Sequence, residues 1–180
     1  MFKYPLSLEN HWLHHAIWPL TELQQQWLFG TGSLTAKLKA NTNQFSVEVL
    51  SEKHMMLTES DALMCGLAVQ NVLVREVLLM GNGQAQVYAQ SWIPTDLLDN
   101  DLSLAALGDK PLGEYLFQHA DLIRNTIEVA QFSVSHCLLQ LVKSLNLPAA
   151  CCFGRRSVFS LAEHKIMVCE IFLPNSVLYR

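Results

Sequence analysis

The order of apolar and polar residues along the chain predicts an antiparallel sheet. Residues 68–80 and 84–93 are apolar runs on either side of Gly81-Asn82-Gly83, a spacing typical of a β-hairpin. Alternation of apolar and polar residues predicts a half-buried strand at 44–50. The remaining predicted strands are 122–131 and, as a second hairpin about residues 162–164, 157–161 and 165–173.

Helices are predicted around these strands. Thr21 can cap a short helix that ends before Gly30, and Ser33 can cap a second helix at residues 34–38. Residues 96–107 are predicted to form a third helix.

The most amphipathic segment is 133–146, whose apolar residues recur at helical spacing up to Pro148. We expect this helix to lie on the sheet, with a lid or a partner surface as the alternatives. Helices packed around an antiparallel sheet predict an α+β fold.

Length and charge narrow the class of protein. The 180 residues suit one domain, 1–180, and 12 Lys and Arg against 16 Asp and Glu give a net charge of -4, which argues against a nucleic-acid binder. No apolar window reaches the length of a membrane span, and the N-terminus lacks the pattern of a signal peptide. We therefore expect a cytoplasmic monomer.

Cysteine and histidine residues do not predict a metal site. The five cysteines are odd in number, and Cys151 and Cys152 are adjacent rather than spaced for zinc, so we expect reduced thiols. His11, His14 and His15 have helical spacing, but no carboxylate or cysteine completes a ligand set. A surface cluster is the simpler interpretation.

Two charged residues lie within apolar strands. Arg75 and Glu170 each share a strand face with apolar residues, and an unpaired buried charge is costly. They can pair with each other, reach solvent at a sheet edge, or bind a ligand. Glu76 lies on the opposite face from Arg75 and is predicted at the rim. The doublet Arg155-Arg156 is either solvated or contacts an anion.

The sequence also resembles a known family, the chorismate pyruvate-lyases. The segments that carry the resemblance, in order, are Arg75-Glu-Val-Leu-Leu79, Leu107-Gly-Asp-Lys-Pro-Leu-Gly-Glu-Tyr-Leu-Phe117, Ile127-Glu128, Gly154-Arg-Arg-Ser157, Glu170-Ile-Phe-Leu-Pro174 and Leu178-Tyr179. The resemblance runs from about Trp27 to Tyr179. It leaves 1–26 as an unmatched N-terminal segment and 132–153 as a region with an extra amphipathic helix.

The resemblance implies cleavage of chorismate into 4-hydroxybenzoate and pyruvate, the entry step of ubiquinone synthesis, without metal or organic cofactor. It implies about six antiparallel strands and flap-like helical segments that enclose a buried ligand site. Carried over to this chain, the ring carboxylate is bound by Arg75 and the backbone N–H of Leu112, and Glu170 faces the ring hydroxyl as a candidate base. Leu34 stands at the flap contact, where the family usually has methionine.

Chorismate carries two carboxylates, so we also expect a second cation in the site. Arg155 or Arg156 is the candidate for the enolpyruvyl carboxylate. Two other functions remain open. One is another chorismate-type lyase. The other is a non-catalytic sensor for small acids, because ligand domains of some transcription regulators share this fold. Such regulators carry a basic winged-helix segment ahead of the domain, which 1–26 are too short to form, so we favour the lyase.

Overall fold

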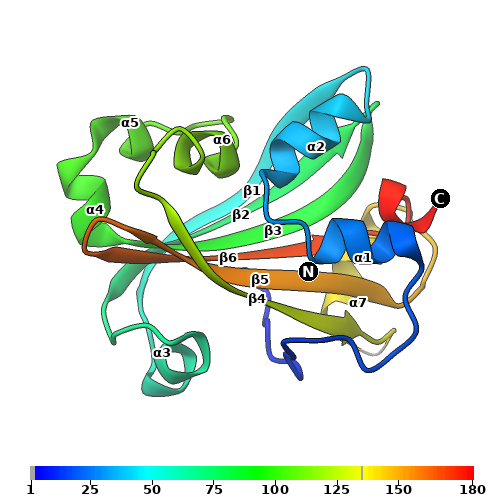
Figure 1. The fold of residues 1–180 in the computed structure, drawn as a ribbon, viewed down its shortest axis with the longest axis horizontal. Coiled ribbons are helices and arrows are strands. Elements are labelled where there is room, and N and C mark those ends of the chain that lie inside the picture. The colour runs from blue at the N-terminus through cyan, green and yellow to red at the C-terminus, as the bar shows by residue number, and fades with distance from the viewer. Residues whose placement is uncertain (1–2, 135) are drawn as a thin grey trace.

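The computed structural model describes residues 3–134 and 136–180, and it contains one six-stranded antiparallel sheet with the strand order β1-β2-β3-β6-β5-β4 (Figure 1). Both predicted hairpins are confirmed, and they meet where β3 pairs with β6 at the centre of the sheet. The strands are β1 (Phe45–Met56), β2 (Asn71–Gly81), β3 (Gln84–Pro94), β4 (Ile123–Phe132), β5 (Cys152–Leu161) and β6 (His164–Phe172).

Short helices surround the sheet, and the predicted α+β fold is confirmed. They are α1 (Glu22–Leu28), α2 (Leu34–Ala40), α3 (Glu59–Cys65), α4 (Thr95–Asn100), α5 (Leu102–Ala105), α6 (Leu112–Leu116), α7 (Leu138–Ser144) and the 3-10 helix η1 (Val177–Tyr179). Thr21 and Ser33 cap α1 and α2 as predicted. In the described ranges, none of the helices has the length and apolar character needed to cross a membrane.

Two predicted helices differ from the structure. The segment 96–107 is divided at Asp101, whose backbone is extended and whose side chain accepts the N–H groups of Ser103 and Leu104, so that α5 starts anew. The segment 133–146 is helical only from Leu138, the start of α7, and residue 135 lies outside the described residues.

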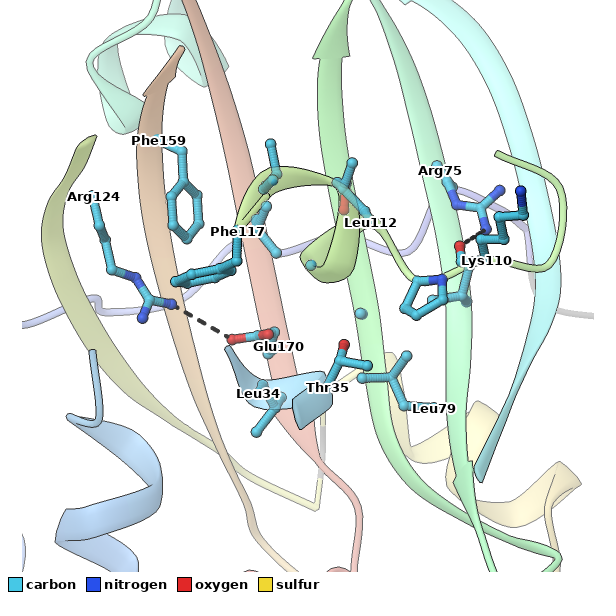
Figure 2. Close-up of a pocket in the computed structure, with 17 residues that line it drawn as sticks. Leu34, Thr35, Arg75, Leu79, Lys110, Leu112, Phe117, Arg124, Phe159 and Glu170 are labelled. Atoms are coloured by element: carbon cyan, nitrogen blue, oxygen red, sulfur yellow. Dashed lines mark hydrogen bonds and ion pairs between the residues drawn. The ribbon is translucent and has the colours of Figure 1, made fainter. Parts of the chain in front are cut away.

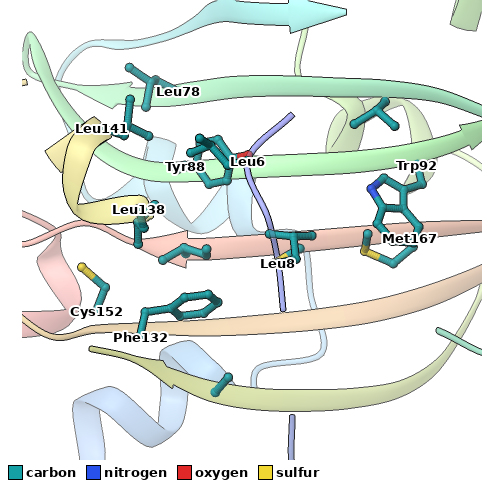
Figure 3. Close-up of a cluster of buried hydrophobic side chains, with 14 of the residues drawn as sticks. Leu6, Leu8, Leu78, Tyr88, Trp92, Phe132, Leu138, Leu141, Cys152 and Met167 are labelled. Atoms are coloured by element: carbon teal, nitrogen blue, oxygen red, sulfur yellow. The ribbon is translucent and has the colours of Figure 1, made fainter. Parts of the chain in front are cut away.

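Each face of the sheet has its own hydrophobic core. On one face, α1 and α2 pack over β2, β3 and β6, and α4 to α6 pack against a neighbouring cluster. On the other face, Figure 3 shows Leu138 and Leu141 of α7 beside the N-terminal segment, where Leu6 and Leu8 cross the strands. Helix α7 therefore covers the sheet, on the face opposite to Arg75.

Glu76 lies in the core and not at the rim, where the sequence predicts it. Its exposed fraction is 0%, and it lies beneath the N-terminal segment. Its Oε1 accepts hydrogen bonds from the Leu6 N–H (2.7 Å) and the Tyr88 hydroxyl (2.5 Å). Burial, with Glu76 beside it, raises the pKa of Tyr88. The partner that makes this burial possible is 70 residues away in the chain, beyond any local pattern.

Gly154 of β5 tests the packing of this core. A Cβ atom there would lie 2.7 Å from Cε2 of Phe132 and 3.3 Å from Cγ1 of Ile171. We expect Gly154→Ala to lower the free energy of unfolding by about 1 to 3 kcal/mol in urea denaturation, because overpacking forces neighbours out of place. Gly32→Ala is the control, since no atom lies within 4 Å of its added methyl group. Equal unfolding midpoints for the two variants would contradict this account.

Candidate active site

A pocket lies between the sheet and the helices α2 and α6, with about 570 Å³ of unfilled space including its opening to solvent. Its walls are mostly apolar, and its charged lining residues are Arg75, Lys110, Arg124 and Glu170 (Figure 2). Arg75 and Glu170, singled out in the sequence, therefore line one pocket from β2 and β6.

Arg75 defines one end of the pocket. Its exposed fraction is only 2%, which excludes an edge position in solvent. The guanidinium forms an ion pair with Glu52 of β1, and its Nη2 donates to the carbonyl oxygens of Gly108 (2.6 Å) and Lys110 (3.2 Å). Arg75 thus also fixes the loop that leads into α6. An ion pair between Arg75 and Glu170, one of the alternatives, is not formed.

The pairing of Glu52 with Arg75 depends on a β-bulge. In β1, Val49 is opposite Val77, so regular alternation would place Ser51 opposite Arg75. The register shifts between Val49 and Ser51, and Glu52 takes that position instead. The bulge therefore places a carboxylate beside the buried guanidinium.

Glu170 lies at the other end of the pocket, and its neighbours are not only apolar. It is directly opposite Arg155 in the β5–β6 ladder, and its Oε2 accepts a 2.6 Å hydrogen bond from the Arg155 Nε. The Nη2 of Arg124 lies 4.0 Å from the same oxygen (Figure 2). Two guanidinium groups therefore flank this carboxylate.

Arg124, like Lys110, is a charged pocket residue that the sequence analysis did not single out. In β4, Val129 points to the pocket face, so strict alternation would turn Arg124 to the other face. A register irregularity between Arg124 and Ile127 brings Arg124 opposite Phe159 instead, with its guanidinium carbon 4.8 Å from that ring. No signal in the single sequence marks this irregularity.

The other two arginine candidates are placed differently. Arg155 is on the pocket face, but it holds Glu170 from behind and donates to the Trp27 and Gly30 carbonyls rather than lining the pocket. Arg156 is on the opposite face, paired with Glu128. Adjacent residues of a strand point to opposite faces, so the structure does not bring Arg156 to the pocket.

The helices α2 and α6 close over the pocket. Leu34 and Leu112, their first residues, both line it. Gly113 permits close approach, because a Cβ there would be 3.2 Å from Oγ1 of Thr35. An ion pair between Lys39 and Glu114 joins the same two helices at the surface. This arrangement resembles the flaps expected from the sequence.

A hydrogen bond ties α6 to the preceding helices. The hydroxyl of Tyr115 donates to the carboxylate of Asp101, the residue that separates α4 from α5. Hydrogen bonds from Ser103 and Tyr115 lower the pKa of Asp101 to about 2. The charged carboxylate of Asp101 therefore holds α6 to the junction between α4 and α5.

The site has the features of a binding pocket for an aromatic or cyclic acid. Arg75 and Lys110 offer positive charge at one end, and Glu170 offers a hydrogen-bond acceptor at the other. Phe117 and Phe159 provide apolar walls at the Glu170 end, beside Arg124. His11, His14 and His15 are exposed, and the described His, Cys, Asp and Glu residues form no group of three that could hold a metal ion.

A protein-family model described as chorismate lyase matches residues 10–180. A probable chorismate pyruvate-lyase of Pseudoalteromonas translucida (strain TAC 125) is 42% identical over 180 residues, covering 99% of this chain and all of the relative. Another of Psychromonas ingrahamii (strain DSM 17664 / CCUG 51855 / 37) is 40% identical over 157 residues, covering 85% of this chain and 83% of the relative.

Among solved structures, the effector domain of PhnF from Mycobacterium smegmatis superposes with a TM-score of 0.60. The alignment covers 81% of this chain and 91% of that domain, at 16% sequence identity. At this identity the likeness shows a common fold alone.

The Asp101–Tyr115 hydrogen bond predicts a measurable titration. Tyr115→Phe removes a donor to the carboxylate, so the pKa of Asp101 should rise toward its usual value, measured by NMR titration of its carboxyl carbon. Because the pKa of Asp101 is lower in the folded state, its stabilising contribution is present above about pH 4 and lost as the pH falls toward 2.

The remote variant Tyr179→Phe serves as the control, since that hydroxyl contacts Phe153 and Phe172 instead. An unchanged Asp101 titration in Tyr115→Phe would show that this hydrogen bond does not form.

Proposed function

Because the chain belongs to the chorismate lyase family, we propose that it cleaves chorismate into 4-hydroxybenzoate and pyruvate, as the entry step of ubiquinone synthesis. The observation that carries the proposal is that Arg75 and Glu170 line one apolar pocket from different strands. A cation and an acceptor at opposite ends suit a ring with a carboxylate and a hydroxyl in para positions.

The proposed reaction balances within the substrate. Chorismate is a cyclohexadiene with a carboxylate on C1, an enolpyruvyl ether on C3 and a hydroxyl on C4. Cleavage breaks the C3–O bond and the C4–H bond, and the C–H electron pair completes the aromatic ring. The methylene carbon of the departing enolpyruvyl group gains a hydrogen and becomes the methyl group of pyruvate, by one of two routes. The C4 hydrogen is transferred directly, or a base takes the C4 proton and returns it to the methylene carbon. No redox partner or cofactor is needed, and orientation of the substrate is the main task of the protein.

Arg75 and the backbone N–H of Leu112 are proposed to bind the ring carboxylate. Three of the five guanidinium N–H groups of Arg75 already donate to Glu52, Gly108 and Lys110, which leaves two for the ligand. Leu112 is the first residue of α6, where the N–H has no carbonyl of its own helix to bond. The same loop that Arg75 holds therefore leads to the second donor.

Glu170 is proposed to accept a hydrogen bond from the C4 hydroxyl and to be the candidate base for the C4 hydrogen. Its second contact, the hydrogen bond from Arg155, fixes the carboxylate in position from behind. General base catalysis requires the carboxylate to come within hydrogen-bond reach of the hydrogen that it removes, which a ring with its C4 hydroxyl on Glu170 would provide. The first residue of α2, Leu34, is proposed to contact the ring when the helices close and exclude water.

Direct assay tests the proposal. Purified protein incubated with chorismate should release 4-hydroxybenzoate and pyruvate in equal amounts, followed by chromatography of the aromatic acid and an enzymatic assay of pyruvate. Tight binding of 4-hydroxybenzoate without turnover would indicate a sensor instead. A different aromatic product would indicate another chorismate-type lyase.

Substitution of Arg75 tests the proposed carboxylate clamp. We expect Arg75→Ala to weaken transition-state binding by on the order of 2 to 5 kcal/mol, measured as the fall in kcat/KM. Arg75→Lys should restore only part of this loss, because an ammonium group cannot hold Glu52, two carbonyls and a carboxylate together.

The matched control for Arg75 is Arg156→Gln, which removes another buried, ion-paired arginine, on the opposite face. Its folded fraction should keep the wild-type kcat/KM. A wild-type kcat/KM in Arg75→Ala would exclude Arg75 from the substrate site.

A further inference from the structure

The two arginines beside Glu170 lie at unequal distances from its carboxylate. Arg155 forms a close ion pair with Glu170, with its Nε 2.6 Å from Oε2, whereas the nearest contact of Arg124 with the same oxygen is 4.0 Å. One carboxylate therefore faces two guanidinium groups, and the closer one already neutralises it. Arg124 is left as a pocket-lining cation whose charge is not matched.

The hydrogen bonds of Arg124 leave one side of its guanidinium available. Its Nε donates to Oγ of Ser157 (3.0 Å), and its Nη1 donates to the carbonyls of Gly30 (3.2 Å) and Thr31 (3.0 Å). Across the described chain, the Nη2 group makes no hydrogen bond, and its contact is the one to Glu170 at 4.0 Å. Three anchors thus hold the guanidinium while Nη2 faces the pocket (Figure 2).

The lowered pKa of Arg124 agrees with an incompletely compensated charge. Burial, followed by the nearby charge of Arg155, lowers the pKa of Arg124 to about 10, although Glu170 acts in the opposite direction. The side chain remains cationic at neutral pH, in surroundings that do not compensate its charge fully. An anion that enters beside Nη2 would supply the missing compensation.

The chemistry of the proposed substrate places an anion at this point. If the ring carboxylate is at Arg75 and the C4 hydroxyl at Glu170, the C3 ether lies next to the hydroxyl and therefore at the Glu170 end of the pocket. The enolpyruvyl carboxylate extends from that ether. Arg124 is the pocket-lining cation at that end, whereas Lys110 lies beside Arg75.

We propose, on the basis of the function proposed above, that Arg124 binds the enolpyruvyl carboxylate and so distinguishes the dianionic substrate from the monoanionic aromatic product. Arg75 and Glu170 contact groups that substrate and product share. Arg124 contacts only the group that leaves. Cleavage therefore removes the ligand of Arg124 together with pyruvate, and the aromatic product remains held by the other contacts.

Binding of designed ring acids tests this assignment without turnover. The probe is 3-(carboxymethoxy)-4-hydroxybenzoate, which adds a second carboxylate next to the hydroxyl. The comparison compound is its amide, 3-(carbamoylmethoxy)-4-hydroxybenzoate, of nearly equal shape. Calorimetry with the wild-type protein should give at least about tenfold tighter binding of the acid, as expected for a charge-assisted hydrogen bond. Equal affinities of the two compounds would overturn the proposal.

Variants then assign the preference to Arg124. In Arg124→Gln the preference for the acid should disappear, while the affinity for 4-hydroxybenzoate changes less than about threefold, because that ligand lacks the second carboxylate. Arg124→Lys, which keeps the charge, should show an intermediate preference and decides the matter if Arg124→Gln does not fold. Arg156→Gln is the matched buried arginine and should keep the full preference. An undiminished preference for the acid in either Arg124 variant that folds would overturn the proposal.

The same measurements separate this inference from the proposed function. Wild-type protein that binds the acid more tightly than the amide but leaves chorismate intact would refute the lyase and retain the second carboxylate site. Wild-type protein that cleaves chorismate but shows no preference would refute the role of Arg124 alone. In an active enzyme, Arg124→Gln should lower kcat/KM for chorismate by on the order of 100-fold.

Discussion

The pocket depends on the compensation of charges that lie within a sheet face. Arg75 is 2% exposed, and the side chain of Glu170 is 12% exposed, so neither can rely on water for its solvation. Each has a protein partner that leaves part of it accessible to a ligand: Glu52 beside Arg75 and Arg155 behind Glu170. Because removal of one partner from a buried pair leaves an uncompensated charge, these contacts fix both ends of the pocket before any ligand arrives.

Side chains along each strand alternate between the two faces of the sheet, and the two faces have different surroundings. One face carries the pocket beside two hydrophobic clusters, and the other carries the core in which the N-terminal segment buries Glu76. Neighbouring residues of one strand serve these different purposes, as Arg75 with Glu76 and Arg155 with Arg156 illustrate.

Short helices cover the pocket, and contacts between them hold them in place. Helices α2 and α6 meet through Gly113 and Thr35, and α6 is held to the preceding segment by Tyr115 and Asp101. Few-residue helices depend on such tertiary contacts, since isolated helices of this length are not stable in water. The cover over the pocket therefore depends on contacts between short helices and not on helices that are stable by themselves.

The two hairpins, the caps of α1 and α2, and the face that Arg75 shares with apolar residues of β2 could be predicted from the sequence. Turns, caps and alternation are local properties of the chain. The family resemblance could also be found there, because its motifs are short runs of residues. The sequence also predicted that the embedded charges need partners. Which partners they have depends on contacts between distant parts of the chain. Two register irregularities, in β1 and β4, turn Glu52 and Arg124 to the pocket face, and a segment 70 residues away covers Glu76. Regular alternation cannot foresee an interrupted ladder, and strand order is set by contacts distant in the chain.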